Sequence, residues 1–152
     1  MEYSIKSLES FHVIGISVRT TNQNSQSDKD IGSLWQRFTE GNLAAQINDK
    51  LSDDIYCVYT EYESDHTGFY TAILGCKIKG GSEAPRGFVS VNIPAGTYQV
   101  YKPKGKFPES IANAWREIWK APISRKYTAD FDLYKAGPKS FEETEVEIYL
   151  AV

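Results

Sequence analysis

Residues 54–79 read DIYCVYTEYESDHTGFYTAILGCKIK, and this stretch decides the fold class. Two runs rich in β-branched and aromatic residues, 54–63 and 69–79, are typical of strands. The SDHTG segment between them, residues 64–68, has the polar and small residues of a hairpin turn. The stretch therefore predicts two consecutive antiparallel strands.

The segments on either side repeat one order of elements. In the first half, a predicted strand at 11–18 is followed by apolar residues that are spaced for one helix face. In the second half, strand-like segments at 88–93 and 97–101 are followed by the same spacing. The helix residues are Ile31, Leu34, Trp35 and Phe38 in the first half and Ile111, Ala114, Trp115 and Ile118 in the second. Two further strands are predicted at 127–134 and 144–152, so the order strand, helix, strand, strand occurs twice.

This duplication predicts an α+β fold with pseudo-twofold symmetry. We expect one domain over residues 1–152, built from repeats of about 1–81 and 82–152, because Gly80-Gly81 interrupts a strand-rich chain. An antiparallel sheet would form a central groove, covered by the two helices.

The composition excludes several classes of protein. Twenty acidic residues against 17 Lys and Arg give a net charge of -3, which argues against a bare nucleic-acid-binding surface. No apolar run reaches the length of a membrane span and the first residues lack a signal-peptide pattern, so we expect a cytoplasmic protein. Two Cys and two His show no metal-ligand spacing, so we expect neither a metal nor a cofactor.

The alternation of side chains along the strands separates an apolar face from a face of acids and tyrosines. On the apolar side we expect Val146, Ile148 and Leu150, together with Phe131 and Leu133 of the preceding strand. The opposite side is expected to carry Asp130, Asp132, Tyr134, Glu147 and Tyr149, with Tyr59, Glu61 and Tyr70 in the first half.

Two interpretations of the acidic and aromatic face remain open. The face is a solvated sheet surface, as is common for antiparallel sheets, or it lines a groove at the pseudo-symmetry axis. In a groove, an organic cation would neutralise a desolvated carboxylate and stack on aromatic rings. Trp35 and Trp115 lie on the apolar helix stripes, which indicates either core packing or the walls of that groove.

Nearly the whole chain, from Tyr3 to Val152, resembles the GyrI-like or effector-binding domains. The most specific segments are IPAGTY (93–98), DFDLY (130–134) and VEIYLAV (146–152). The resemblance implies a duplicated fold, as in the drug-sensing domains of AraC-type and MerR-type activators, gyrase modulators and integron-cassette proteins. It also implies that Asp132 occupies the base of the groove, where the family commonly has Glu. The last strand of the family commonly contains a Pro, which is missing from residues 146–152 of this chain.

The leading prediction is a stand-alone protein that binds lipophilic or cationic aromatic molecules, with no DNA-reading part of its own. The predicted ligand-binding residues are Asp132, Glu147, Tyr59, Tyr149, Trp35, Trp115, Glu61 and Tyr70. Two alternatives are a hydrolase of cyclopropane-type electrophiles and a protein-interaction modulator of the gyrase-inhibitor type. We expect binding rather than catalysis, and either a protein partner or a homodimer is compatible with the strands.

Overall fold

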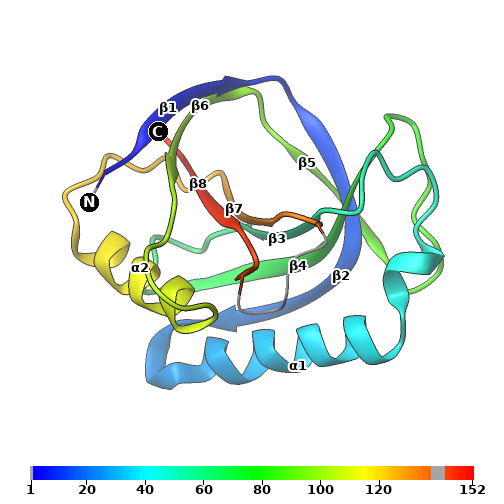
Figure 1. Ribbon diagram of the computed structural model, residues 1–152, viewed down its shortest axis with the longest axis horizontal. Coiled ribbons are helices and arrows are strands. Elements are labelled where there is room, and N and C mark those ends of the chain that lie inside the picture. Colours follow the sequence, from blue (N-terminus) through cyan, green and yellow to red (C-terminus); the bar gives the residue numbers. More distant parts are fainter. Residues whose placement is uncertain (1, 138–142) are drawn as a thin grey trace.

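The fold is seen in a computed structural model that describes residues 2–137 and 143–152. Within these residues, eight strands form one sheet in which all neighbouring strands are antiparallel, and two α-helices pack on it (Figure 1). The strands are β1 (Ser4–Leu8), β2 (Phe11–Thr21), β3 (Ile55–Thr60), β4 (Phe69–Ile78), β5 (Val89–Ile93), β6 (Gly96–Tyr101), β7 (Ala129–Tyr134) and β8 (Val146–Ala151). The α-helices are α1 (Gln26–Glu40) and α2 (Glu109–Lys120), and short 3-10 turns occupy Gln23–Ser25 and Leu43–Gln46. The predicted α+β class is confirmed.

The strand order, β1-β6-β8-β7-β3-β4-β2-β5, is symmetric about the contact between β7 and β3. The counterparts in the two halves are β1 and β5, β2 and β6, β3 and β7, and β4 and β8. The two strands of each pair lie equally far from this contact on opposite sides. The edge strands are exchanged, since β1 pairs with β6 and β5 pairs with β2. Each half therefore contains a leading edge strand in addition to the four expected elements. The sequence analysis missed β1 because most of its side chains are exposed and show no apolar alternation. The repeat boundary near residues 81 and 82 stays a prediction.

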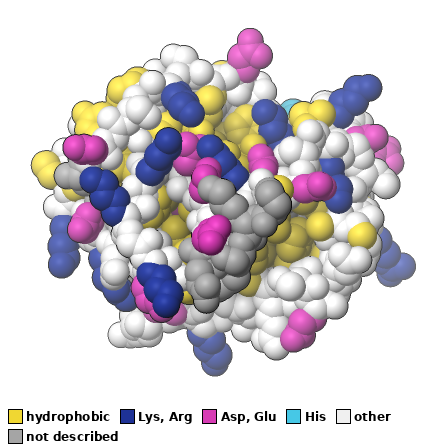
Figure 2. Space-filling view, viewed as in Figure 1, with side chains coloured by type: hydrophobic (Ala, Val, Ile, Leu, Met, Phe, Trp, Pro, Cys, Tyr) yellow, Lys and Arg dark blue, Asp and Glu magenta, His cyan; other side chains and the backbone are white. Residues whose placement is uncertain are grey.

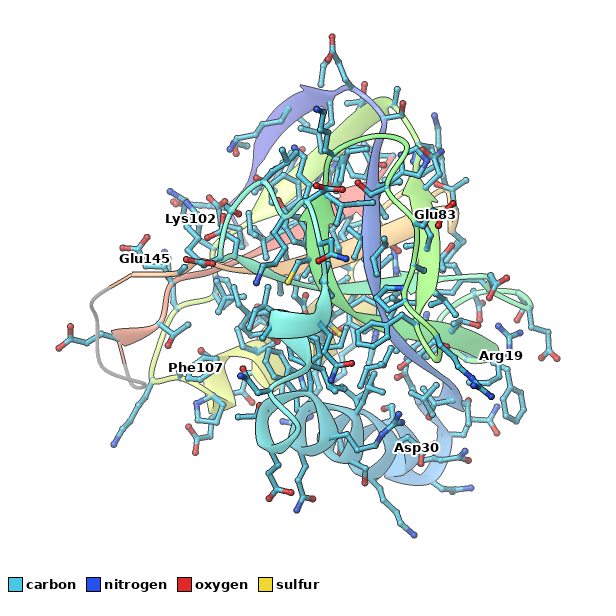
Figure 3. The ribbon with its side chains drawn as sticks, turned by 90° about the vertical axis from the view of Figure 1, so that its right-hand side faces the viewer. Arg19, Asp30, Glu83, Lys102, Phe107 and Glu145 are labelled. Carbon is cyan, nitrogen blue, oxygen red and sulfur yellow. The ribbon has the colours of Figure 1, made fainter. Side chains whose placement is uncertain are left out.

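Both helices cover the same face of the sheet. Leu34 and Phe38 of α1 are buried in one cluster with Ile14, Leu74 and other side chains of β2 and β4. Ala114 and Ile118 of α2 are buried with Tyr101, Ile148 and Leu150. In the view turned by 90°, α1 lies along the bottom of the molecule and α2 lies in its lower left part (Figure 3). No helix among the described residues is both long and apolar enough to cross a membrane.

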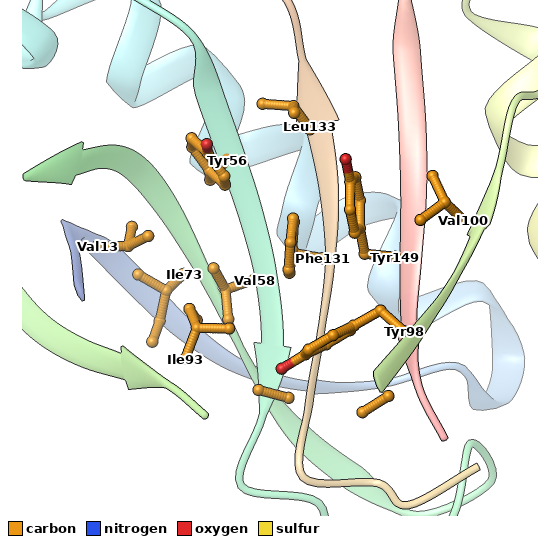
Figure 4. Close-up of a cluster of buried hydrophobic side chains, with 12 residues drawn as sticks. Val13, Tyr56, Val58, Ile73, Ile93, Tyr98, Val100, Phe131, Leu133 and Tyr149 are labelled. Carbon is orange, nitrogen blue, oxygen red and sulfur yellow. The ribbon is translucent and has the colours of Figure 1, made fainter. Parts of the chain in front are cut away.

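The opposite face of the sheet curls around an aromatic core, shown in Figure 4. This cluster includes Val13 of β2 and Tyr98 of β6, which lie near opposite edges of the sheet. Phe131 and Tyr149 stack at its centre, with ring centroids 4.5 Å apart and planes inclined by 12°. The cluster spans the sheet because the sheet is curled into a half-barrel. On the outside, acidic and basic side chains are interspersed over the face drawn in Figure 2.

The strands β2 and β4 are in close contact at a glycine pair. Gly15 and Gly75 are direct partners in the register. A Cβ atom on Gly75 would lie 2.0 Å from the Ile14 carbonyl oxygen, and one on Gly15 would lie 2.1 Å from the Leu74 carbonyl oxygen. Only glycine fits this contact, which lies in the part of the sheet that α1 covers.

Candidate ligand-binding site

A cavity of about 620 Å³ lies on the helix-covered face of the sheet. Ile31 of α1 and Ile111 of α2, at matched positions of the two helices, both line it. The other lining residues are Asn22, Ser25, Ser27, Asp28, Gly32, Tyr59, Tyr62, His66, Tyr70, Pro108, Glu109, Ala112, Trp115, Arg116, Trp119, Arg125, Asp132 and Tyr134. The volume and the aromatic lining are those of a site for a drug-sized molecule.

Asp132, in the middle of β7, is a buried carboxyl group on this cavity. Its side chain points to the helix-covered face and is 0% exposed. The Tyr59 hydroxyl donates a hydrogen bond of 2.6 Å to Oδ2, and Trp115 Nε1 donates one of 3.0 Å to Oδ1. The Tyr134 hydroxyl lowers the pKa of the same carboxyl group. Two aromatic side chains, one from β3 and one from α2, therefore hold one carboxyl group in place.

The environment of Asp132 shifts its ionisation towards neutral pH. Burial raises the pKa of Asp132 from 3.8 to about 7. The hydrogen bonds from Tyr59 and Trp115 and the nearby Tyr134 hydroxyl oppose this rise, and the nearby Asp130 charge adds to it. Burial also holds the pKa of Tyr59 and of Tyr134 well above 10, so both hydroxyls remain donors. No Lys or Arg in the described parts of the chain forms an ion pair with Asp132.

The aromatic rings around Asp132 form a continuous group. The Tyr59 ring meets the Trp115 ring edge to face, with centroids 5.2 Å apart. It meets Tyr70 in the same way at 5.9 Å, and the Tyr70 hydroxyl donates a 2.7 Å hydrogen bond to Asn22 Oδ1. The carboxyl group thus lies against aromatic side chains whose polar atoms are already oriented.

A second carboxyl group on the same strand face has its own cation. Asp130 is fully buried and accepts hydrogen bonds from Arg125 Nη2 at 2.7 Å and from the Tyr62 hydroxyl at 2.6 Å. The Ala151 amide donates to its other oxygen at 2.8 Å. Burial lowers the pKa of Arg125, but the charge and hydrogen bond of Asp130, together with Tyr62 and Tyr127, outweigh this and raise the pKa above its ordinary value. Asp130 therefore has a charge partner within the protein, whereas Asp132 has none among the residues that the structure describes.

Four of the eight predicted residues, Asp132, Tyr59, Tyr70 and Trp115, line this cavity together. Trp35 does not line it: its ring packs edge to face on Tyr134, with centroids 4.8 Å apart. Glu61 also lies outside, with an exposed side chain and a backbone carbonyl that accepts a hydrogen bond from Arg19. Trp35 and Trp115, although they lie 80 positions apart in a repeated pattern, therefore have different surroundings.

Glu147 and Tyr149 lie on the other face of the sheet, and this corrects the expected alignment of the last two strands. The sequence analysis grouped Phe131 and Leu133 with Ile148, but the register pairs Phe131 with Tyr149 and Leu133 with Glu147. Asp132 is paired with Ile148 and shares its face. Alternation assigns faces within a strand, but the register between strands depends on which side chains pack in the core.

The surroundings of Glu147 differ from those of Asp132. Glu147 is 5% exposed and lies 3.3 Å from Lys135 Nζ and 4.0 Å from Lys102 Nζ. Its Oε1 accepts a 3.2 Å hydrogen bond from the Tyr149 hydroxyl. Tyr149 also lines a second cavity, of about 540 Å³, on the inner face of the half-barrel. Glu147 thus has cations of the protein beside it.

Sequence reasoning missed Arg125, Tyr62 and Trp119 as cavity residues. Arg125 lies between α2 and β7, in a segment without periodicity. The one available signal was that Asp130 and Asp132 share a strand face, because two buried carboxylates require a nearby cation. Among the described residues, no three or more His, Cys, Asp and Glu side chains gather as metal ligands would. Both cysteines are buried free thiols.

Comparison with known families gives one decisive match. Residues 4–152 match the family model Cass2, described as integron-associated effector binding protein. The chain belongs to this Cass2 family. The predicted resemblance to effector-binding domains is therefore confirmed, and small-molecule binding is the general function that the family description carries.

Individual relatives agree with membership of the Cass2 family. The putative transcriptional regulator protein YobU of Bacillus subtilis is 28% identical over 144 residues, covering 91% of this chain and 89% of YobU. Transcriptional regulator BrlR of Pseudomonas aeruginosa is 26% identical over 132 residues, which are 80% of this chain but only 46% of BrlR.

Solved structures share the fold of this Cass2 family member. The integron cassette protein VCH_CASS2 of Vibrio cholerae superposes with a TM-score of 0.77 and 31% identity, covering 99% of this chain and 95% of that one. The structure of SAV2435 bound to tetraphenylphosphonium gives a TM-score of 0.78 at 21% identity, with coverage of 99% and 93%.

Proposed function

We propose that this protein binds lipophilic aromatic cations in the cavity between α1 and α2, with Asp132 as the charge partner. The observation that carries the proposal is a fully buried carboxyl group, held by Tyr59 and Trp115, that no cation of the described residues pairs with. An ionised carboxylate in such a place is costly unless a ligand supplies the opposite charge.

The ligand class follows from what surrounds Asp132. The rings of Trp115, Tyr59 and Tyr70 offer apolar area and negative ring faces, which favour a large, weakly hydrated cation over a small ammonium ion. The family description and the tetraphenylphosphonium-bound structural relative support small-molecule binding in general. The cationic and aromatic character of the ligand is our inference from the cavity.

Binding of a cation should be coupled to loss of a proton from Asp132. Because burial raises the pKa of this carboxyl group to about 7, a large fraction is protonated at neutral pH before the ligand arrives. The bound cation favours the ionised form, so affinity should rise with pH below about 7 and level off above it. A neutral aromatic ligand in the same cavity should show no such dependence.

The test compares two probes of the same shape and opposite charge, tetraphenylphosphonium and tetraphenylborate. Isothermal titration at pH 7.5 should give measurable affinity for the cation, and Asp132→Asn should weaken it by about tenfold or more. Glu147→Gln is the matched control, because this acid is also buried but lies on the other face of the sheet. The affinity of the Glu147→Gln variant for tetraphenylphosphonium should stay within about twofold of that of the unmodified protein.

Two results would contradict the proposal. One is equal affinity of the unmodified protein and Asp132→Asn for tetraphenylphosphonium. The other is tighter binding of tetraphenylborate than of the cation by the unmodified protein, since an anion should be rejected beside a carboxylate.

A further inference from the structure

The cavity contains a second polar group whose hydrogen-bonding capacity is only partly used, the guanidinium of Arg125. The Arg125 side chain is 3% exposed, and its Nη2 donates to Asp130 at 2.7 Å. Its Nε and Nη1 atoms are buried and have no hydrogen-bond acceptor among the described residues. Arg125 is one of the residues that line the cavity. A buried donor without an acceptor is unfavourable and uncommon in folded proteins.

Stacking on aromatic rings does not account for these two donors. The Arg125 guanidinium carbon lies 4.4 Å from the Tyr127 ring centroid and 5.7 Å from that of Trp115. Rings placed over a guanidinium interact with its faces, whereas its N–H groups point outward in its own plane. The rings stabilise the positive charge, but Nε and Nη1 still have no acceptor in the part of the chain that the structure describes.

Trp115 connects this guanidinium to the carboxyl group of the cation site. Its Nε1 donates to Asp132, and Arg125 lies over its ring. The guanidinium and the carboxyl group are therefore neighbours of one indole, but they differ in whether the protein supplies a partner for their charge. The Arg125 charge is paired with Asp130, so the guanidinium offers donors without presenting an uncompensated positive charge to a cationic ligand.

We propose that the unused N–H donors of Arg125 form a subsite for a hydrogen-bond acceptor of the ligand. The subsite selects aromatic cations that carry a carbonyl or ester oxygen, and this oxygen accepts a hydrogen bond from Nε or Nη1. This inference rests on the proposed function, because the cationic part of the same molecule is held at Asp132. The two donors are closed to water, so a covering side chain must rotate as the oxygen enters. Of the two rings over the guanidinium, Trp115 is held by its hydrogen bond to Asp132, so the half-buried Tyr127 is the side chain that must rotate.

The subsite is tested with two dyes that carry the same charge and differ in one acceptor group. Tetramethylrosamine is a xanthylium cation with a plain phenyl ring, and tetramethylrhodamine methyl ester adds an ester to that ring. Fluorescence anisotropy gives the ratio of their dissociation constants. We expect the unmodified protein to bind the ester about tenfold more tightly, the effect of one hydrogen bond to a charged donor.

Two variants assign that preference to Arg125. Arg125→Lys keeps a cation beside Asp130 but removes the planar set of N–H donors, so the ratio should fall to within about twofold of one. Asp132→Asn should weaken both dyes and leave the ratio as it is. A thermal unfolding curve of each variant shows that the comparison is made on folded protein.

The outcomes separate the subsite from the proposed function. A ratio near one in the unmodified protein, or a tenfold ratio that persists in Arg125→Lys, overturns the Arg125 subsite while cation binding stands. Failure of the protein to bind either dye overturns cation binding and the subsite together. A loss of the ratio in Asp132→Asn but not in Arg125→Lys assigns the ester preference to Asp132 and likewise overturns the subsite.

Discussion

Replacing Asp132 with Asn should stabilise the protein in a way that grows with pH. In the unfolded chain this carboxyl group ionises near its ordinary pKa of 3.8, whereas burial raises the pKa to about 7 in the folded protein. Below pH 3.8 both states hold the proton, and the contribution of Asp132 to stability is fully present. Between pH 3.8 and 7 the unfolded state releases the proton first, so stability is lost as pH rises. Above pH 7 the loss stays constant.

The magnitude follows from the two pKa values. Each pH unit between them contributes about 1.4 kcal/mol, so the full loss is about 4 kcal/mol at pH 8. Asn has almost the same shape and no charge. Its Oδ1 can accept from Trp115 Nε1 while its amide donates to the Tyr59 hydroxyl, which keeps the contacts of the carboxyl group. Any residual loss of hydrogen bonding is independent of pH and cancels when values at different pH are compared.

The assay is urea unfolding at a series of pH values from 4 to 8.5, followed by tryptophan fluorescence. The free energy of unfolding of Asp132→Asn minus that of the unmodified protein should increase by about 3 to 4 kcal/mol over this range. Other titrating groups occur in both proteins and contribute equally. Parallel curves across the whole range would refute the reasoning, because Asp132 would then ionise at the same pH in the folded and unfolded states.

Two further changes test the site and the sheet. Tyr59→Phe removes the 2.6 Å hydrogen bond that lowers the pKa of Asp132, so the pH midpoint of tetraphenylphosphonium binding should rise by about half a unit or more, and an unchanged or lower midpoint would contradict this. Gly75→Ala places a Cβ atom against the Ile14 carbonyl and should lower the free energy of unfolding by about 2 kcal/mol or more, measured by urea denaturation. Gly32→Ala in α1 is its control, since no atom of the described residues, apart from its chain neighbours and the helix backbone, lies within 4 Å of the added atom, and this change should be neutral or stabilising. Equal effects of the two changes would count against the close β2–β4 contact.

Much of the fold could be predicted because its signals are local. The apolar spacing from Ile31 to Phe38 is the buried stripe of α1, and the run at 69–79 is β4 with a difference of one residue at its end. The elements without a local signal were missed or shortened. β1 has exposed, mixed side chains, and the first turn of α1 begins at Gln26, five residues before the first apolar position.

The site was predictable only in part, for a related reason. Asp132 and Tyr59 lie on neighbouring strands that meet at the symmetry centre of the sheet, and both carry signals that sequence can show: an acid and a ring on an alternating strand. Arg125 lies in an irregular segment and becomes part of the site only because Asp130 is buried beside it. Nothing in its own neighbourhood in the sequence distinguishes it from the other basic residues.

By itself, the sequence determined most of the segments that become strands and helices, the repetition of their order, and which side chains share a face within each strand. These properties depend on the periods of the backbone, 3.6 residues in a helix and two in a strand. The tertiary structure alone decided that Asp132 faces the helices while Glu147 and Tyr149 face the interior of the half-barrel. The register of β7 against β8 depends on packing Phe131 on Tyr149, and long-range packing of this kind is not encoded in the period of either strand.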